Sequence, residues 1–370
     1  MRILMLADRM ESGGAETHVE CLATELTRLG YEVEVLSGGG GIADRMERSG
    51  IVQRRYLWSD RPVVCHLRAR RVLKKAMQEH RFDVLHAHTR RSAFLLRDLR
   101  LFRPRVCKKA LTVVTIHAAF SCTPLLRRLS YWGDRTIAVS EDLRARVCDL
   151  FGVSGEAVSV IPNGVDPQIF YPPARPAPAE TVLFASRLDG DCSLGAEWLC
   201  KIAPDLRKSY PALQIRIAGG GERLDFLRVS AMEANRLCGA ETVRLLGNVE
   251  DMAAEYRRHA IFVGVSRAAV EAAMSGCCVV LCGNEGWGGV LSSESLIPAV
   301  SNFCCRGEGE ACEELLLSAL RELLGDRQLR AVMAASARQW MLRDYTSRAM
   351  AKAVARIYGN GKEISDGSAL

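Results

Sequence analysis

Short apolar runs alternate with longer amphipathic segments through the first half of the chain. Residues 2–7 form an almost entirely apolar run, which predicts a buried strand. Val19, Leu22 and Leu26 recur at helical spacing, so residues 15–29 predict an amphipathic helix. The same alternation predicts strands over residues 33–36, 51–58, 84–85, 111–116 and 136–139, and a long basic helix over residues 63–81. Strands and helices that alternate in this way indicate a parallel sheet covered on both faces.

A proline-rich segment, residues 162–178, interrupts this alternation. It holds six prolines and little periodicity, so we interpret it as a linker. The alternation then restarts, with strands expected over residues 181–184, 213–218, 243–246, 261–265 and 279–281. We therefore expect two doubly wound α/β domains, residues 1–168 and residues 169–345. Residues 346–358 predict a helix that packs back on the N-terminal domain, and residues 359–370 predict a polar tail.

The composition is typical of a globular protein, with 48% hydrophobic and 25% charged residues among 370. A chain of this length can form two domains, each with its own core. No apolar run reaches the roughly 18 residues of a membrane span, and the N-terminal run is too short for a signal peptide. We therefore expect a cytoplasmic protein. The 14 cysteines show neither a CxxC motif nor zinc-ligand spacing, which favours free thiols over a disulfide or metal framework.

Positive charge is concentrated in one block, residues 61–110. The block holds 15 lysines and arginines against 3 acidic residues, whereas the whole chain has a net charge of only +7. Two interpretations stay open: a docking surface for an anionic membrane or lipid-phosphate acceptor, and a well-solvated helix face. Nucleic acid is not an expected partner, because the block lacks interleaved aromatic residues and a recognised binding motif.

Two glycine turns fall where open α/β sheets bind ligands, beyond the carboxyl ends of strands. Gly13 and Gly14 follow the first strand and precede a helix, and residues 219–221 follow the strand expected over residues 213–218. Glycines at such turns let a ligand approach the backbone and leave helix N–H groups for an anion. Ordinary tight-turn chemistry is the alternative. The spacing is not GxGxxG, which disfavours a dinucleotide cofactor.

Five segments occur together in a characteristic order. They are residues 13–18 (GGAETH), 161–166 (IPNGVD), 186–189 (SRLD), 219–222 (GGGE) and 270–272 (VEA). In combination they resemble glycosyltransferase family 4, and the resemblance covers nearly the whole chain. It implies the GT-B fold, in which two Rossmann-like doubly wound domains face each other across a cleft. It also implies a nucleotide-sugar donor site in the second domain, an acceptor side in the first, and transfer with retention of anomeric configuration.

The resemblance assigns roles by position. Arg187 matches the arginine that holds the donor diphosphate, and a guanidinium suits this role because it binds phosphate oxygens bidentately. Glu271 matches the glutamate that accepts hydrogen bonds from the donor ribose, and His117 matches the histidine near the donor sugar. The structural alternatives are a surface ion pair, a solvated helix start and strand-end packing, respectively. The expected donor-binding positions are Gly13, Gly14, Gly219, Gly220, Asn248, Gly264, Val265, Ser266 and Ala268.

The sequence departs from the family pattern at two positions. Cys192 stands where the family usually has a second phosphate-binding lysine, and Val263 stands where it usually has a glutamate that touches the donor sugar. A charged hydrogen bond contributes about 1.5–3 kcal/mol, so loss of the lysine costs roughly ten- to a hundredfold. We hypothesise that Arg267 supplies the missing positive charge, which makes it the fourth expected catalytic residue.

The implied reaction moves a hexose or N-acetylhexosamine from a nucleoside-diphosphate sugar to a hydroxyl of a glycan or lipid-linked acceptor. Its expected setting is cell-surface glycan or glycolipid synthesis at the inner face of the membrane. No DxD-like aspartate pair lies in a suitable place, so no metal or other cofactor is expected. His86 and His88 show no third ligand in the sequence. The main alternative is a non-catalytic donor-binding or scaffolding homologue, whereas a dehydrogenase or epimerase is disfavoured by the missing dinucleotide fingerprint.

Overall fold

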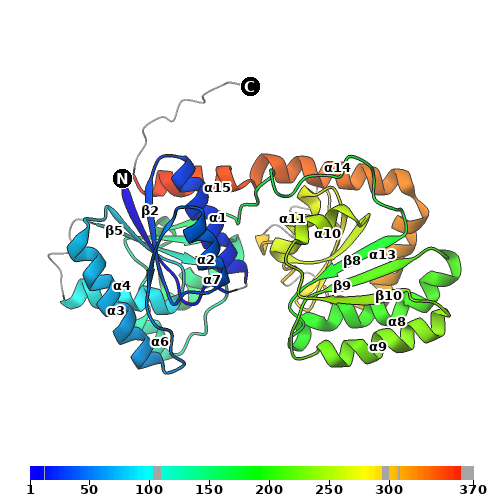
Figure 1. Ribbon diagram of the computed structural model, residues 1–370, viewed down its shortest axis with the longest axis horizontal. Coiled ribbons are helices and arrows are strands. Elements are labelled where there is room, and N and C mark those ends of the chain that lie inside the picture. Colours follow the sequence, from blue (N-terminus) through cyan, green and yellow to red (C-terminus); the bar gives the residue numbers. More distant parts are fainter. Residues whose placement is uncertain (12, 103–109, 294–299, 307–308, 360–370) are drawn as a thin grey trace, which may run out of the picture. The chain divides into compact units, whose positions relative to one another are not determined.

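The computed structural model describes residues 1–11, 13–102, 110–293, 300–306 and 309–359. The chain forms two compact units, which Figure 1 shows in the colours of the sequence. The first unit joins Met1–Gly164 to Ser347–Leu370, and the second is Val165–Thr346. The following parts of the expected basic block and tail lie outside the described residues: Arg103, Arg105, Lys108, Lys109 and residues 360–370.

The first unit is built on a seven-stranded parallel sheet in the order β3-β2-β1-β4-β5-β6-β7. Its strands are β1 (Arg2–Leu6), β2 (Glu32–Ser37), β3 (Val52–Arg55), β4 (Val84–Ala87), β5 (Leu111–Ile116), β6 (Arg135–Ala138) and β7 (Val158–Val160). The chain winds outward from β1 to β3, returns to β4 beside β1, and continues to β7. The winding therefore reverses between β1 and β4, which is where doubly wound sheets bind ligands.

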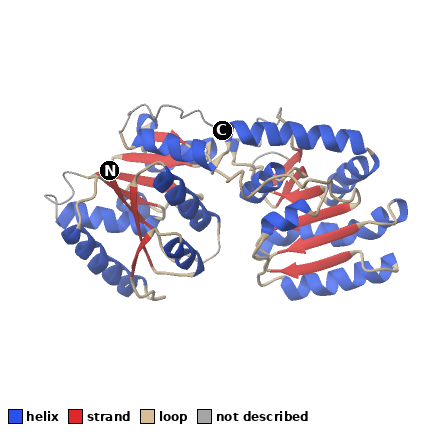
Figure 2. Cartoon of the chain, turned by 45° about the horizontal axis from the view of Figure 1, so that its top comes forward, coloured by secondary structure: helices blue, strands red, loops and turns tan. Residues whose placement is uncertain are grey.

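Helices cover both faces of this sheet (Figure 2). They are α1 (Gly14–Arg28), α2 (Gly41–Arg48), α3 (Pro62–Glu79), α4 (Arg90–Phe102), α6 (Pro124–Leu129), α7 (Glu141–Phe151) and α15 (Ser347–Ile357). Successive side chains of a strand point to opposite faces. Ile3 and Met5 accordingly pack in the core beneath α1, α2 and α15, whereas Leu4 and Leu6 pack in the core beneath α3 and α4.

The last helix, α15, is part of the first unit although it comes at the far end of the chain. Its Met350, Ala351 and Val354 are buried in the same core as the apolar face of α1. Just beyond the helix, the Tyr358 hydroxyl lies 2.7 Å from Nδ1 of His86, a residue 272 positions earlier. The first sheet is therefore covered on one face partly by residues that follow the whole second unit.

The second unit has a six-stranded sheet in the order β10-β9-β8-β11-β12-β13. Its strands are β8 (Thr181–Ala185), β9 (Gln214–Ala218), β10 (Val243–Gly247), β11 (Ile261–Gly264), β12 (Cys278–Gly283) and β13 (Gly286–Val290). All pairs are parallel except β12–β13, which is antiparallel. The sequence did not predict β13, because three of its five residues are glycines and the segment shows no apolar alternation.

Two helical layers cover this second sheet. The helices are α8 (Leu194–Ser209), α9 (Leu224–Cys238), α10 (Met252–Arg257), α11 (Ser266–Met274), α13 (Glu313–Gly325) and α14 (Arg327–Asp344). One core cluster contains apolar residues of α8, α9 and α13, and the other contains apolar residues of α10, α11 and α14. Two doubly wound sheets confirm the predicted fold class.

Some expected details differ from the structure. The strand expected over residues 51–58 is wrong at its end, because β3 stops at Arg55 and Leu57 is 73% exposed. β3 is an edge strand, paired only with β2, so no second partner extends it. The cysteines in the described part of the chain are free thiols, as predicted. Among the described helices, none combines the length and the hydropathy that a membrane crossing requires.

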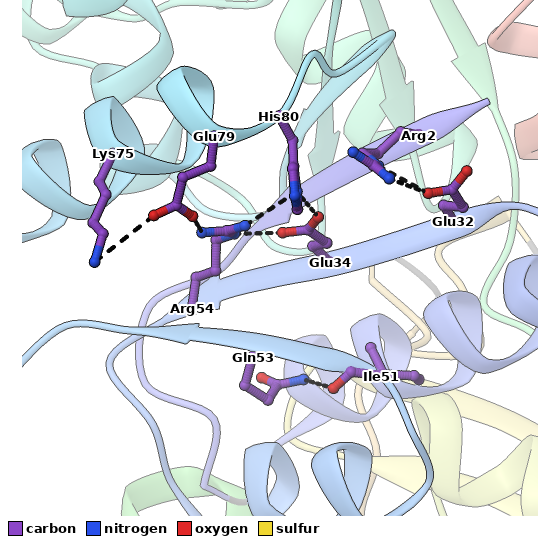
Figure 3. Close-up of polar contacts among 9 residues, drawn as sticks. All are labelled: Arg2, Glu32, Glu34, Ile51, Gln53, Arg54, Lys75, Glu79 and His80. Carbon is purple, nitrogen blue, oxygen red and sulfur yellow. Dashed lines mark hydrogen bonds and ion pairs between the residues drawn. The ribbon is translucent and has the colours of Figure 1, made fainter.

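A partly buried charge network joins β3 to its neighbours (Figure 3). Arg54 of β3 forms an ion pair with Glu34 of β2, and the two side chains are 13% and 7% exposed. Arg54 also reaches Glu79 at the end of α3, with 2.6 Å between Nη1 and Oε2, and Nδ1 of His80 lies 2.8 Å from the other Glu34 oxygen. The crossover helix α3 ends at the amino edge of the sheet. The network therefore joins β2 and β3 to the end of that helix.

Candidate functional site

The sheet of the second unit reverses its winding between β8 and β11. β8 pairs with β9 on one side and with β11 on the other. The segments that follow these three parallel strands therefore meet at one carboxyl edge. Arg187 follows β8, the glycine turn of residues 219–221 follows β9, and Ser266 follows β11. The structure thus brings the sequence-predicted donor positions of this unit to a single edge of its sheet.

Arg187 lies on a loop that is braced against the glycine turn. The Leu188 N–H donates to the Gly220 carbonyl oxygen at 3.0 Å, and the Glu222 N–H donates to Oδ1 of Asp189 at 3.0 Å. The Arg187 side chain is exposed, and within the described residues it forms no ion pair. Its guanidinium is therefore displayed from a fixed backbone, an arrangement that suits a bidentate anionic ligand.

The glycines of this turn are explained by close packing. A Cβ on Gly219 would lie 1.9 Å from the Ser186 carbonyl oxygen, and φ there is +140°. A Cβ on Gly220 would lie 2.6 Å from Oδ1 of Asn248, an exposed residue after β10. The Gly219 N–H donates to the Gly247 carbonyl oxygen at 2.7 Å. Gly219 therefore shapes the turn, and its N–H is already bonded within the second unit.

Helix α11 starts immediately after β11, with Val265 as its N-cap residue. Ser266 has φ +58°, and its N–H donates to the Phe303 carbonyl oxygen at 2.8 Å. The Ser266 N–H is therefore already bonded within the second unit. The N–H group of Ala268 lies in the first turn of the helix, where intrahelical acceptors are lacking and an anion is favoured.

The end of β11 corrects a second expectation. Val263 is fully buried in the core cluster shared with α8 and α9. This position cannot contact a donor sugar whatever residue stands there, so our interpretation of it as the family's missing glutamate is wrong. At Gly264, φ is +155° and a Cβ would lie 2.8 Å from the Phe262 ring, which accounts for the glycine without a ligand. Cys192 is half-buried in the short 3₁₀ turn Gly190–Ser193 that precedes α8.

Arg267 and Glu271 form an ion pair one turn apart on α11. Nε and Oε1 are 2.8 Å apart, and the side chains are 12% and 13% exposed. The hydroxyl of the fully buried Tyr256 donates to Glu271 Oε2 at 3.3 Å. Burial, and then the Glu271 charge, raise the pKa of Tyr256 well above its usual value, so this hydroxyl stays a donor. No pattern in the sequence pointed to Tyr256, because only the packing of α10 beside α11 brings it to the site.

This arrangement leaves Glu271 able to bind a ligand. A carboxylate has about four lone-pair positions, and Arg267 and Tyr256 each use one. The remaining positions can accept hydrogen bonds from a diol such as a ribose. Because both neighbours hold the carboxylate in one orientation, the structure favours a positioned acceptor over a solvated helix start.

In the first unit, Gly13 and Gly14 lie where β1 leads into α1. A Cβ on Gly14 would meet nothing within 4 Å, and a Cβ on Gly13 would meet only the flexible Glu16 side chain. Packing within the unit therefore does not require either glycine.

His117 follows β5 and lies in a group of three histidines. The other two are His18 on α1 and His88 after β4, and each offers a ring nitrogen within 4.8 Å of the others. Nδ1 of His88 lies 3.4 Å from Nε2 of His117, and Nδ1–H of His18 donates to Oδ1 of Asn163 at 2.8 Å. The sequence offered no third ligand beside His86 and His88, whereas the folded unit brings two further histidines to His88.

His86 has a different role from this group. Its Nε2 bonds to Oγ1 of Thr115 at 2.7 Å, and its Nδ1 bonds to the Tyr358 hydroxyl. Burial lowers the pKa of His86 to about 3. Burial, followed by the neighbouring histidines, lowers the pKa of His88 well below its usual value. Both rings are therefore neutral at neutral pH, and His86 is hydrogen-bonded within the core at both ring nitrogens.

Comparisons with known proteins agree with this description. Residues 12–169 match the family model described as Glycosyltransferase Family 4, and residues 179–326 match the model described as Glycosyl transferases group 1. Glycogen synthase from Mycobacterium tuberculosis is 26% identical over 401 residues, which cover 97% of this chain and 94% of that protein. One of the subunits of human phosphatidylinositol N-acetylglucosaminyltransferase is 28% identical over 318 residues, which cover 79% of this chain and 64% of that protein.

Solved structures share the fold. The Anabaena protein HepE, crystallised in complex with UDP-glucose, matches with a TM-score of 0.72 and 16% identity over 97% of this chain and 99% of that chain. At this identity the similarity bears on the fold alone, and it confirms the expected GT-B class. The two family models match successive parts of the chain and together span most of it. The chain therefore belongs to the GT-B glycosyltransferases of family 4 and group 1.

Proposed function

We propose that this protein transfers a hexose or N-acetylhexosamine from a nucleoside-diphosphate sugar to a hydroxyl of a glycan or lipid-linked acceptor, with retention of anomeric configuration. The observation that carries the proposal is that Arg187 and Glu271 both lie at the carboxyl edge of the second unit's sheet. One is an exposed guanidinium on a braced loop, and the other is a carboxylate held by two neighbours. Together they match the two ends of a nucleoside diphosphate, which are its phosphates and its ribose diol.

Arg187 would bind the diphosphate, and Glu271 would accept hydrogen bonds from the ribose. Arg267 acts through Glu271, which it orients, and it adds positive charge at the start of α11. Negative charge builds on the diphosphate as the anomeric bond breaks. Preorganised cations and helix N–H groups at that edge stabilise this charge where it develops.

The proposed transfer needs no separate base. The bond between the anomeric carbon and the diphosphate oxygen breaks, and a bond to the acceptor oxygen forms on the same face of the sugar. The acceptor proton passes to the departing phosphate oxygen. His117 is the position that resembles the family's histidine near the donor sugar, and its partial exposure after β5 is compatible with such a contact.

A ligand-binding experiment tests the donor. Uridine nucleotides come first, because a solved relative of this fold binds UDP-glucose. We expect UDP, UDP-glucose or UDP-N-acetylglucosamine to raise the melting temperature of the full chain, since ligand at about a hundred times its Kd stabilises by about 2.7 kcal/mol. Arg187→Ala should abolish the shift. If no nucleoside diphosphate or its sugar stabilises the folded protein, the proposed function is wrong.

Part of the basic block supports a membrane-bound acceptor. On α3, Val63 and Leu67 are 71% and 49% exposed, and Arg70, Arg71 and Lys74 continue the same face. Exposed apolar residues beside cations suit the surface of an anionic bilayer. We propose that the protein docks there from the cytoplasm. Vesicles with anionic lipid should sediment the protein at low salt, and the triple variant Arg70→Ala, Arg71→Ala, Lys74→Ala should stay in solution; failure of the parent chain to bind contradicts the docking.

A second candidate is a donor-binding homologue without turnover, and Cys192 in place of the family lysine favours it. The two candidates separate in one experiment. A catalyst should release UDP from its sugar nucleotide in the presence of a membrane extract that contains acceptors, whereas a binding homologue should show the thermal shift alone. NMR of the product's anomeric proton would then establish retention or inversion.

A further inference from the structure

Three of the chain's 7 histidines gather in the first unit. They come from three separate elements: His18 from α1, His88 from the segment after β4, and His117 from the segment after β5. The two strands are neighbours in the sheet, and α1 starts at the same carboxyl edge. The fold therefore fixes the backbone of each ligand independently, which is the condition for a preorganised site.

The spacing within the group suits a metal ion better than a hydrogen bond. Nδ1 of His88 and Nε2 of His117 are 3.4 Å apart, whereas well-formed N–H hydrogen bonds are about 2.7–3.2 Å long. Two nitrogens bound to one tetrahedral zinc at about 2.0–2.1 Å lie about 3.3–3.4 Å apart. The longest separation in the group is within 4.8 Å, which ring rotation can shorten on binding.

The surroundings of the group also resemble those of a metal site. Asn163 accepts a hydrogen bond from Nδ1–H of His18, and this makes Nε2 the nitrogen that carries the ring's lone pair. A hydrogen bond from the second ring nitrogen to an oxygen is typical of metal-binding histidines. In His88, Nε2 is buried and has no hydrogen-bond partner among the described residues. No hydrogen bond at Nε2 therefore fixes the ring proton on Nδ1, the nitrogen that faces His117.

The chemistry of three imidazoles selects the class of ion. The neutral imidazole ring is the form that binds metal. Imidazole nitrogens suit zinc and its neighbours in the transition series, whereas magnesium and calcium prefer oxygen ligands. His18 and His88 are buried, but His117 is half-buried and is followed by the exposed Ala118 and Ala119. An ion could enter from that side.

We propose that His18, His88 and His117 form a binding site for one divalent transition-metal ion of the zinc class, with its fourth position on the solvent side of His117. The site belongs to the first unit, whereas the Arg187 edge belongs to the second, and the metal is not a requirement of the transfer reaction. The site does engage His117, so metal occupancy would remove this ring from contact with a sugar. The proposal stands on the geometry of the first unit and does not depend on the proposed function.

Cobalt is a suitable probe for the full-length chain after removal of metal with a chelator. We expect one equivalent of Co²⁺ to give the intense visible bands of tetrahedral cobalt, without the near-ultraviolet charge-transfer band of a thiolate ligand. One equivalent of Zn²⁺ should displace it. Absence of stoichiometric binding, or a thiolate band that accounts for the bound cobalt, would overturn the proposal.

Variants then identify the ligands. His117→Asn should weaken Zn²⁺ binding by at least about a hundredfold, since even outer-sphere changes cost about 10–100-fold, and so should His88→Asn. The matched control is His66→Asn, because His66 pairs with Asp98 between α3 and α4 and lies outside the group. If the buried His88→Asn variant fails to fold, the half-buried His117→Asn still decides. Unchanged zinc affinity in His117→Asn would contradict the site.

Discussion

Two arginine–glutamate pairs of this protein have similar chemistry and similar burial but lie at different places along their sheets. Arg54 and Glu34 are 13% and 7% exposed, and Arg267 and Glu271 are 12% and 13% exposed. In the first pair Glu34 lies in the middle of β2, and the residues at the end of α3 contact both side chains. The second lies where α11 begins, at the carboxyl edge. Burial and pairing therefore do not separate a structural ion pair from one proposed to bind a ligand, whereas position beyond the carboxyl ends of the strands does.

The partners of the two carboxylates differ as well. Glu34 meets Arg54 and His80, and Arg54 is in turn shared with Glu79, so this carboxylate is enclosed by its own unit. Glu271 meets one cation and the neutral hydroxyl of Tyr256. Loss of a partner should therefore lower the folding stability at the Arg54–Glu34 pair. At the Arg267–Glu271 pair it should weaken ligand binding.

The largest effect is expected for Arg54→Ala. The change leaves Glu34 buried without its cation, which costs about 3–5 kcal/mol of unfolding free energy. Urea denaturation, followed by hydrogen exchange in β2 and β3, measures it. Lys75→Ala is the matched control, because this side chain is 77% exposed and should show no measurable loss. Equal stability of the two variants would mean that the buried pair does not hold the sheet edge.

Arg267→Ala should act on activity. Loss of one charged hydrogen bond is worth about 1.5–3 kcal/mol, so we expect kcat/KM to fall by roughly ten- to a hundredfold, with a smaller loss of stability than in Arg54→Ala. Steady-state kinetics and denaturation on the same preparation separate the two effects. Arg267→Lys should recover part of the activity. If Arg267→Ala lowers stability without lowering activity, the Arg267–Glu271 pair has the same structural role as the Arg54–Glu34 pair.

Cys192→Lys adds a positive charge at the same carboxyl edge of the second unit's sheet as the Arg267–Glu271 pair. The lysine stands where the family usually has a phosphate-binding residue, so we expect donor affinity to rise by about tenfold. Calorimetric titration with the sugar nucleotide measures the change. Cys192→Met provides similar length without charge. An equal response of the two variants would show that position 192 does not face the diphosphate.

The smallest effect is expected for a neutral buried pair in the first unit. Tyr358→Phe removes the hydroxyl that bonds to His86, and a neutral hydrogen bond contributes about 1 kcal/mol. Thermal denaturation should show a modest decrease. Tyr171→Phe is the control, because this ring is 47% exposed. A loss as large as that of Arg54→Ala would mean that charge is not what distinguishes the Arg54 pair.

The sequence predicted most of the fold because strands and helices alternate with clear apolar periodicity. The exceptions have local causes: β13 is rich in glycine, and β3 ends early at the edge of its sheet. Arg187 and Glu271 were predicted from short sequence motifs. The residues of each motif also lie close together in the structure. Val263 was misinterpreted because residue counting assumed a longer connection, whereas only Val265 separates β11 from α11.

The proximity of the three histidines could not be predicted from the sequence. His18, His88 and His117 are far apart along the chain, and nothing in their spacing indicates a common location. Their proximity follows from the winding order, which places β4 beside both β1 and β5. The contact of Tyr256 with Glu271 could not be predicted for the same reason, because it depends on how α10 packs against α11.

The position of α15 sets the order in which the two units can finish folding during synthesis. A ribosome finishes residues 1–164 long before Met350 and Val354, which complete the core beside α1, have been translated. Until then the nascent first unit exposes an apolar surface that a chaperone would recognise. The second unit is continuous in sequence and has all its own residues earlier than the first. The half of the protein that is made first is therefore the half that finishes folding last.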